Sequence, residues 1–310
     1  MPSPSFGQEM QDVSLRRLLS NALRTPLEQH VSAYLGRAWR VMKAQDKSDA
    51  ASHPAAILSD ETYSVFVKLG EGGLACDQFS QELAGLRFLT ERSGVLTPAG
   101  IGTVQVGGEV LLILEAVQLV ERERFHWRQM GRALAKIHSI KWDRCGFESH
   151  CYWGSLYQDN SPLVDWVEFF RERRLAPRLR AAIDSGHLPL DVVPQVEKLS
   201  SRLQGLCGPK VEPSLLHGDA HQNNFLSTAK GPVMIDPAVY YGHPEIDLAF
   251  VDFFAPVSDE LFQGYQEIAA LDPGFVERRD LWRIPAWLAM VEVDGPQHLD
   301  KLMAALRNYV

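Results

Sequence analysis

Residues 215–226 read LLHGDAHQNNFL, and residues 232–236 read PVMID. The apolar residues of these two stretches predict short strands, and the polar residues between Leu216 and Phe225 predict a loop. Residues 228–231 predict the turn that joins two of the strands into a hairpin.

Three polar side chains of this motif are predicted to converge. The hairpin register carries Asn223 or Asn224 back to within reach of Asp236, while Asp219 projects from the preceding loop. An amide and two carboxylates suit a hard divalent cation such as Mg²⁺, which needs few protein carboxylates when phosphates supply the other oxygens. The remaining carboxylate can position a hydroxyl. Phosphoryl transfer needs this arrangement, because its loose transition state depends on positioning and charge neutralisation.

A lysine and a glutamate earlier in the chain fit the same chemistry. Lys68 lies in a predicted strand at residues 62–69, and Glu82 lies in a helix predicted from about residue 78 to residue 92, after a glycine-rich break. At about 100° per residue, Glu82 falls inside the apolar arc of that helix. A buried carboxylate is costly unless a cation pairs with it. We therefore predict a Lys68–Glu82 pair that orients nucleotide phosphates.

The order of the predicted elements divides the chain into two lobes. A helix is predicted at residues 9–24, and the pattern then alternates strands and one helix in βββαββ order. From about residue 121 onward the pattern is mostly helical. We expect an N-terminal lobe, a hinge and a helical C-terminal lobe at residues 1–114, 115–119 and 120–310.

Together these motifs resemble the fructosamine kinase (ketosamine kinase) family, within the aminoglycoside phosphotransferase and choline kinase branch of the protein-kinase-like fold. The likeness extends over residues 66–250, and the motifs follow the family's order. It implies an α+β, protein-kinase-like two-lobe fold with a small antiparallel sheet in the first lobe. The matching motifs are FVK at 66–68, FSQELAGL at 79–86, QDN at 158–160, DWVEFF at 165–170, HGD at 217–219 with Asn224, DPA at 236–238 and YGHPEIDLA at 241–249.

The resemblance implies an ATP site in the N-terminal part of the chain. Lys68 would contact the α- and β-phosphates, and Glu82 would hold Lys68. In the hinge, the backbone carbonyl of Glu115 and the backbone amide of Val117 would bind adenine. The loop at residues 48–54 lacks the glycine pair that the family commonly carries over the phosphates.

The resemblance also implies the catalytic residues. Asp219 would accept or orient the proton of the acceptor hydroxyl, Asn224 and Asp236 would bind Mg²⁺, and Asp247 would brace the HGD loop through backbone amides. The implied reaction uses MgATP to phosphorylate a hydroxyl of a ketosamine such as a fructosamine or ribulosamine adduct. The alternatives are an aminoglycoside- or choline-type acceptor and a nucleotide-binding pseudokinase. Ala220-His221 replaces the Leu-Trp that is usual in ketosamine kinases.

Other side chains allow competing interpretations. His217 and His221 flank Asp219, and we interpret them as donors that brace the loop rather than as zinc ligands, since no third ligand has suitable spacing. Three tryptophans could stack on a sugar, although aromatic residues in helical lobes belong more often to the core. They are Trp153, Trp282 and Trp287.

Composition restricts the partners and the compartment. Of 310 residues, 31 are Lys or Arg and 39 are Asp or Glu, so the net charge of −8 disfavours a nucleic-acid partner. The longest apolar run, at residues 110–114, is far too short to cross a membrane. Four cysteines without a CxxC pair, and an N-terminus without a secretion signal, favour the cytoplasm. We expect a monomer or a weak homodimer that takes a small-molecule hydroxyl acceptor.

Overall fold

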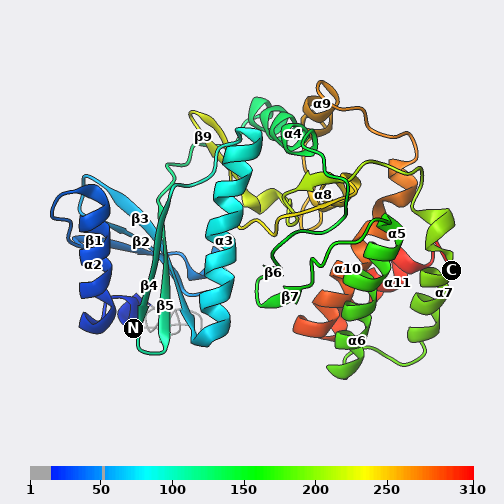
Figure 1. The fold of residues 1–310 in the computed structure, drawn as a ribbon, viewed down its shortest axis with the longest axis horizontal. Coiled ribbons are helices and arrows are strands. Elements are labelled where there is room, and N and C mark those ends of the chain that lie inside the picture. The colour runs from blue at the N-terminus through cyan, green and yellow to red at the C-terminus, as the bar shows by residue number, and fades with distance from the viewer. Residues whose placement is uncertain (1–14, 51–52) are drawn as a thin grey trace, which may run out of the picture. The chain divides into compact units, whose positions relative to one another are not determined.

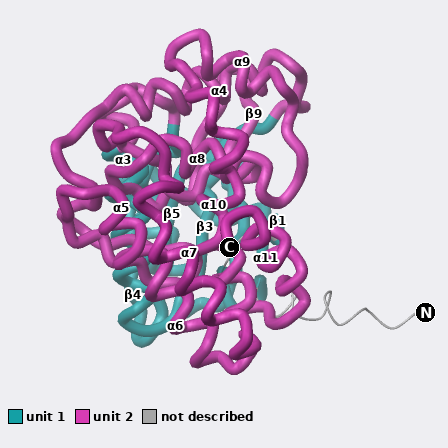
Figure 2. The backbone as a smooth tube through the Cα atoms, turned by 90° about the vertical axis from the view of Figure 1, so that its right-hand side faces the viewer, with its two compact units in different colours: residues 1–88, 97–119 teal, residues 89–96, 120–310 magenta. Residues whose placement is uncertain are grey.

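The computed structural model describes residues 15–50 and 53–310 (Figure 1). Contacts divide the chain into two compact units, which Figure 2 shows in different colours. Unit 1 runs to residue 88 and includes residues 97–119, and unit 2 comprises residues 89–96 and 120–310. The predicted helix at 9–24 begins outside the described residues, as do residues 51 and 52 of the predicted phosphate loop.

A five-stranded antiparallel sheet forms the centre of unit 1. Its strands lie in the order β1-β2-β3-β5-β4. Gly107 and Gly108 form the turn between the last two strands, and the βββαββ order that the sequence predicts is confirmed. The strands are β1 (Lys43–Asp46), β2 (Ala55–Ser59), β3 (Ser64–Glu71), β4 (Gly100–Val106) and β5 (Glu109–Glu115).

Helices of unit 1 pack on opposite faces of this sheet. Helix α2 (Asn21–Leu35) joins the cluster that contains Val65 and Val67 of β3. Helix α3 (Gly72–Ser93) joins the cluster against which Phe66 packs. Because side chains alternate along a strand, Lys68 shares the α3 face with Phe66. The alternation of β3 therefore presents the lysine to the helix that carries Glu82.

Helix α3 begins at Gly72, earlier than the start near residue 78 that the sequence predicts. The glycine-rich break is a direct passage from strand to helix. Gly72 has φ +75°, and its amide donates to the Gly108 carbonyl at 2.8 Å. A Cβ on Gly70 would lie 2.5 Å from the Cβ of Ala75, so only glycine allows the strand to approach the first helical turn this closely.

Unit 2 is mainly helical, with three short antiparallel strand pairs. The pairs are β6 (Cys151–Trp153) with β7 (Leu156–Gln158), β8 (Ser214–Leu216) with β11 (Tyr240–Gly242), and β9 (Phe225–Thr228) with β10 (Gly231–Met234). The helices are α4 (Arg124–His138), α5 (Trp166–Phe169), α6 (Ala176–Asp184), α7 (Val193–Leu206), α8 (Glu245–Phe250), α9 (Glu260–Gln266), α10 (Phe275–Asp294) and α11 (Leu299–Leu306).

Short irregular helices complete unit 2. A π-helical segment, Phe170–Leu175, joins α5 to α6, and a 3-10 turn, Gln222–Asn224, follows the HGD motif. The β9–β10 hairpin and its turn at residues 228–231 match the prediction. Among the described residues, no helix has the length and apolar character needed to span a membrane.

Candidate active site

Lys68 and Glu82 form a buried ion pair in unit 1. Lys68 Nζ lies 2.9 Å from Glu82 Oε1 and 3.0 Å from Oε2, so the ammonium donates to both oxygens. The Lys68 side chain is 3% exposed and the Glu82 side chain 13%. Charges removed from water to this extent need an opposite charge at contact distance. The pairing predicted from the helical spacing of Glu82 is confirmed.

The predicted adenine-binding segment follows the end of β5. The Glu115 amide donates to the Ala99 carbonyl at 2.8 Å, and the Ala116 amide donates to the Ser64 carbonyl at 3.0 Å. These bonds fix the backbone on either side of the Glu115 carbonyl. The Glu115 side chain is exposed, in agreement with a role for its backbone alone. The contacts of Glu115 and Val117 with adenine stay predictions.

Asp247 braces the HGD loop in unit 2. Its Oδ2 accepts from the His217 amide at 2.7 Å, and its Oδ1 accepts from the Gly218 amide at 2.9 Å. A third contact is His138 Nε2, 3.1 Å from Oδ2. Asp247 is 1% exposed, and these donors offset the free energy that burial of its carboxylate costs. The contact with backbone amides that the resemblance implies is confirmed.

A chain of buried hydrogen bonds continues behind Asp247. His138 Nδ1 lies 2.9 Å from the Tyr265 hydroxyl. Burial, together with the charge of Asp247, raises the pKa of Tyr265 above its usual range. Because the Asp247 carboxylate can only accept, His138 Nε2 carries a proton and donates to it. Neither residue belongs to a sequence motif; the signal for His138 is its position at the end of an amphipathic helix, α4.

Gly218 occupies a position that excludes any other residue. Its φ is +81°, and a Cβ there would lie 1.9 Å from the Ala238 carbonyl oxygen. The Ala238 amide donates to the His217 carbonyl at 2.8 Å. The HGD and DPA motifs therefore pack backbone against backbone.

Asn224 holds Asp219 within the loop. Its Nδ2 donates to the Asp219 backbone carbonyl at 2.8 Å and to Asp219 Oδ2 at 3.1 Å. Asn224 is 5% exposed, whereas Asn223 is exposed. Of the two amides that the sequence leaves open, Asn224 is thus the one beside Asp219. Since its nitrogen is engaged, its Oδ1 is the atom suited to a cation.

Asp236 lies two residues after the end of the second strand of the hairpin. The Ile235 amide donates to the Asn224 carbonyl at 3.1 Å, so the chain runs on to Asp236 next to the 3-10 turn. Asp236 has φ +52°, a left-handed conformation that few residues other than glycine adopt. A carboxylate and the Asn224 amide oxygen are donors that fit Mg²⁺ when phosphates complete the coordination.

The two histidines of the loop are neutral at pH 7. His217 Nε2 lies 3.0 Å from the Ile235 carbonyl, and its Nδ1 accepts from the Asp219 amide at 3.3 Å, so His217 braces the loop. Burial lowers the pKa of His217, and burial lowers the pKa of His221 to about 4. His221 Nε2 lies 3.7 Å from Asp219 Oδ2. In the described part of the chain, no three His, Cys, Asp or Glu side chains form a group that could hold a metal ion.

Arg122 is a further loop-bracing residue that sequence reasoning missed. Its guanidinium donates to the Gln222 carbonyl at 3.1 Å and to Ser227 Oγ at 3.0 Å, and it also donates to the Phe225 carbonyl. The guanidinium carbon lies 4.6 Å from the ring centroid of Trp127. One planar cation thus ties the 3-10 turn to β9, and no local pattern in the sequence marks it.

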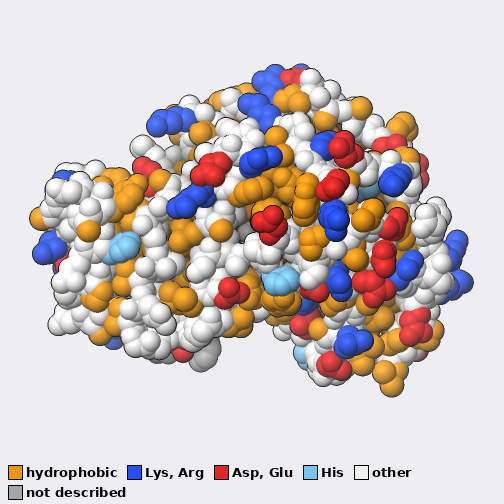
Figure 3. All heavy atoms as spheres, viewed as in Figure 1, with side chains coloured by type: hydrophobic (Ala, Val, Ile, Leu, Met, Phe, Trp, Pro, Cys, Tyr) orange, Lys and Arg blue, Asp and Glu red, His pale blue; other side chains and the backbone are white. Residues whose placement is uncertain are grey.

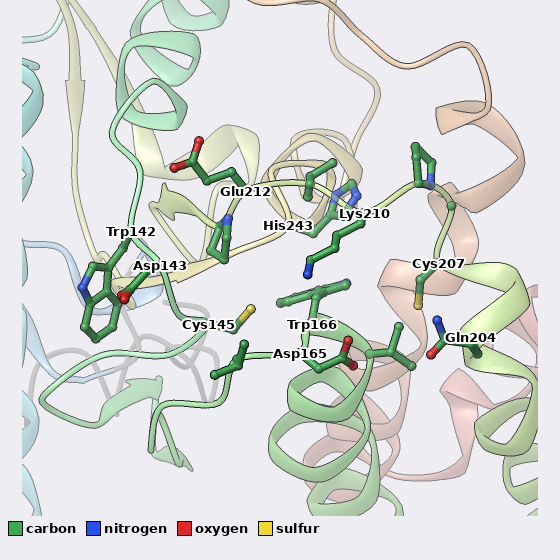
Figure 4. Close-up of a pocket in the computed structure, with 16 residues that line it drawn as sticks. Trp142, Asp143, Cys145, Asp165, Trp166, Gln204, Cys207, Lys210, Glu212 and His243 are labelled. Atoms are coloured by element: carbon green, nitrogen blue, oxygen red, sulfur yellow. The ribbon is translucent and has the colours of Figure 1, made fainter.

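Figure 4 shows a separate cavity of about 460 Å³ in unit 2. Trp142, Cys145, Trp166, Lys210 and His243 contribute to its walls. None of the predicted site residues of unit 2 is among the described residues that line it. Burial raises the pKa of the Cys145 thiol to about 12, so it is no nucleophile at pH 7. This cavity is therefore distinct from the candidate active site.

Comparison with solved structures confirms the α+β, kinase-like fold. A crystal structure described as a "putative fructosamine-3-kinase" from Thermobifida fusca is similar with a TM-score of 0.81 and 28% identity, covering 91% of this chain and 98% of that one. A thermostable mutant of an aminoglycoside phosphotransferase, in a ternary complex with ADP and hygromycin B, has a TM-score of 0.59. Its identity is 13%, over 91% of this chain and 96% of that chain, so it shows the fold alone.

Curated relatives agree with the structural comparison. A probable ketoamine kinase from Vibrio cholerae is 29% identical over 290 residues, which cover 91% of this chain and 98% of the relative. A chloroplastic protein-ribulosamine 3-kinase from Oryza sativa subsp. japonica is 28% identical, over 89% of this chain and 81% of the relative. The family model of fructosamine kinase matches residues 24–310. This chain therefore belongs to the fructosamine kinase family.

Proposed function

We propose that this chain is an ATP-dependent kinase that transfers the γ-phosphate of ATP to a hydroxyl of a ketosamine, such as a fructosamine or ribulosamine adduct. The observation that carries the proposal is Asp219, held by Asn224 at 3.1 Å in a loop whose amides bind Asp247. Phosphoryl transfer to a hydroxyl is accelerated by a carboxylate held where it can accept or orient the hydroxyl proton. Membership of the fructosamine kinase family supports the class of acceptor.

The catalytic loop supplies the chemistry of the acceptor. Asp219 accepts or orients the proton of the acceptor hydroxyl while the hydroxyl oxygen bonds to the γ-phosphorus; the bond from that phosphorus to the bridging oxygen breaks, and ADP leaves. Asn224 Oδ1 and the Asp236 carboxylate would hold Mg²⁺, which neutralises charge on the phosphate oxygens when bound.

Unit 1 supplies the groups for the nucleotide. Lys68, kept in place by Glu82, would contact the α- and β-phosphates as a point charge. The Glu115 carbonyl and the Val117 amide would bind the adenine edge. The phosphate contact depends on a buried ammonium that is already oriented, so little side-chain entropy is lost when ATP binds.

The proposal is tested by replacing the Asp219 carboxylate and by comparing substitutions of the neighbouring residues Asn223 and Asn224. Asp219→Asn, which preserves shape, should lower kcat by about 10²- to 10⁴-fold with a fructosamine as acceptor, the usual contribution of a positioned general base. Asn224→Ala should also lower kcat, whereas Asn223→Ala, the matched control at an exposed amide, should leave it within about twofold. Turnover by Asp219→Asn within twofold of the parent would contradict the assignment.

The two alternatives, another class of acceptor and a pseudokinase, are distinguished by which phosphorylated products form. The parent protein is incubated with ATP and separate fructosamine, ribulosamine, aminoglycoside and choline acceptors, and each mixture is examined by mass spectrometry. The gain of one phosphate on the ketosamines supports the proposal. A phosphate gained only on another acceptor, or thermal stabilisation by ATP without any phosphorylated product, supports one of the alternatives.

Surface charge and the state of the cysteines support the proposed partner and compartment. On the face shown in Figure 3, basic and acidic side chains are interspersed. Such a surface suits a small-molecule acceptor better than the phosphate backbone of a nucleic acid, which needs a basic patch. The four cysteines are free thiols, which fits a reducing compartment such as the cytoplasm. We expect a monomer or a weak homodimer, which sedimentation equilibrium would test.

A further inference from the structure

Two partly exposed aromatic side chains attach to the HGD loop on either side of Asp219. Trp153 Nε1 donates to the Gly218 carbonyl at 2.8 Å. The Phe254 ring packs edge-on against His221, with centroids 4.9 Å apart and an interplanar angle of 89°. Trp153 is half-buried and Phe254 is 52% exposed. The loop that carries Asp219 is therefore flanked by aromatic surface at both ends.

Two buried rings connect these side chains. Trp153 lies 5.4 Å from Phe250, Phe250 lies 5.1 Å from Phe253, and Phe253 lies 5.0 Å from Phe254, measured between centroids. Phe250 and Phe253 are 5% and 8% exposed, so they form the support. The first and the last ring of this row, Trp153 and Phe254, both contact the HGD loop, so both lie on the side of unit 2 where that loop lies. We call Trp153 and Phe254 together the aromatic platform.

The other tryptophans considered for sugar stacking are not available. Trp282 is 1% exposed and donates to Glu245 Oε2 at 2.8 Å, and Trp287 is 9% exposed and packs 4.1 Å from Phe253. Both belong to the core. Trp153 differs because its polar edge is fixed to the catalytic loop while part of its ring stays open. Its orientation is thus coupled to the position of Gly218.

The charges beside the aromatic platform select the kind of ligand. Asp219 contributes a carboxylate, and its Oδ2 lies 3.7 Å from Nε2 of His221, the residue against which the Phe254 ring packs. A cationic amine with an apolar substituent suits this combination, since aromatic faces attract cations and cover hydrocarbon. A substituent with its own carboxylate would be repelled by Asp219 and gain little from the rings.

We propose that Trp153 and Phe254 bind the amine substituent of the acceptor, so that the enzyme prefers ketosamines whose nitrogen carries an aromatic or apolar group. The inference rests on the proposed function, because Asp219 places the reacting hydroxyl next to the platform. Coverage of Phe254 by an aromatic substituent should change kcat/KM by about tenfold, the size expected when roughly 60 Å² of apolar surface leaves water.

The test compares N-benzyl fructosamine with N-carboxymethyl fructosamine at saturating MgATP. The parent should favour the N-benzyl compound in kcat/KM by about tenfold or more, mainly through KM. Phe254→Ala and Trp153→Ala should each reduce that preference at least threefold. Phe125→Ala is the matched control, because Phe125 on α4 is also 52% exposed and lies outside the platform; it should leave the preference unchanged.

Conservative variants keep the test valid if the alanine variants unfold. Phe254→Leu preserves apolar volume without a ring, and Trp153→Phe preserves a ring without the bond to Gly218. Both should lower the preference while thermal unfolding stays close to the parent. If the Trp153 and Phe254 variants lost kcat/KM equally for both acceptors, or if the parent did not prefer the N-benzyl compound, the inference about the aromatic platform would be overturned, whereas the proposed function would stand. No phosphate on any ketosamine in the parent would overturn the proposed function, and the platform with it.

Discussion

Replacing Asp247 by asparagine is expected to destabilise unit 2 and to slow catalysis. The carboxylate accepts from the His217 amide, the Gly218 amide and His138 Nε2 at 2.7, 2.9 and 3.1 Å. The amide of asparagine has one acceptor oxygen, so at least one buried donor is left facing an NH₂ group. With one or two donors unpaired at about 1–3 kcal/mol each, the unfolding free energy should fall by about 1–6 kcal/mol. Because Asp219 follows Gly218 directly, a shift of the loop should lower kcat by tenfold or more.

Urea unfolding and steady-state kinetics measure the two effects. Trp39 lies in unit 1 and the other six tryptophans lie in unit 2, so fluorescence reports mainly on the unit that is perturbed. The KM for ATP should stay within about threefold, since Lys68 belongs to unit 1. Asp300→Asn, at an exposed carboxylate in the first turn of α11, is the control and should change the stability by less than about 0.5 kcal/mol. A stability within that range and a kcat within twofold for Asp247→Asn would refute the bracing argument.

Three further perturbations test other contacts. Glu82→Gln leaves the buried Lys68 ammonium without its carboxylate, so the KM for ATP should rise about tenfold and thermal stability should fall; an ATP titration that gives a parental KM would contradict this. Tyr265→Phe removes one buried hydrogen bond to His138, and urea unfolding should show a loss of about 1 kcal/mol, with a smaller drop in kcat than for Asp247→Asn. Burial lowers the pKa values of His221 and His243 to about 4 from 6.5, so the unfolded chain binds more protons between those pH values. Stability should therefore fall as the pH drops from about 6.5 to 4, by at most about 3 kcal/mol for each histidine, and His243→Gln should flatten that profile in unfolding measured against pH.

The helical and strand periodicity of the sequence was sufficient to predict contacts within one element or between neighbouring elements. The spacing of α3 put Glu82 on the apolar face, and strand alternation put Lys68 on the face that α3 covers, so their pairing could be predicted. The hairpin register brought Asn224 back next to Ile235, the residue before Asp236, for the same reason. These residues are close in the chain or lie on adjacent strands, and their geometry follows from the periods of helix and strand.

Contacts between distant helices could not be predicted in this way. His138 and Tyr265 are 127 positions apart, and only the packing of α4 against α9 brings them together. The early start of α3 was missed because Gly72 and Gly73 disfavour a helix by propensity, whereas close packing of Gly70 against Ala75 requires glycine at that turn. Trp153 could be named from the sequence, but its bond to Gly218 depends on where the β6–β7 hairpin folds back.

The contact between Gly218 and Ala238 links the two loops that carry the predicted catalytic and metal-binding residues. One of these loops carries Asp219 and the other carries Asp236. A Cβ on Gly218 would lie 1.9 Å from the Ala238 carbonyl oxygen, and the Ala238 amide donates to the His217 carbonyl at 2.8 Å. Because the two backbones are in contact at Gly218 and Ala238, a displacement of one loop requires a displacement of the other. A substitution that displaces the Asp219 loop is therefore expected to displace Asp236 as well, because the two loops share this backbone contact.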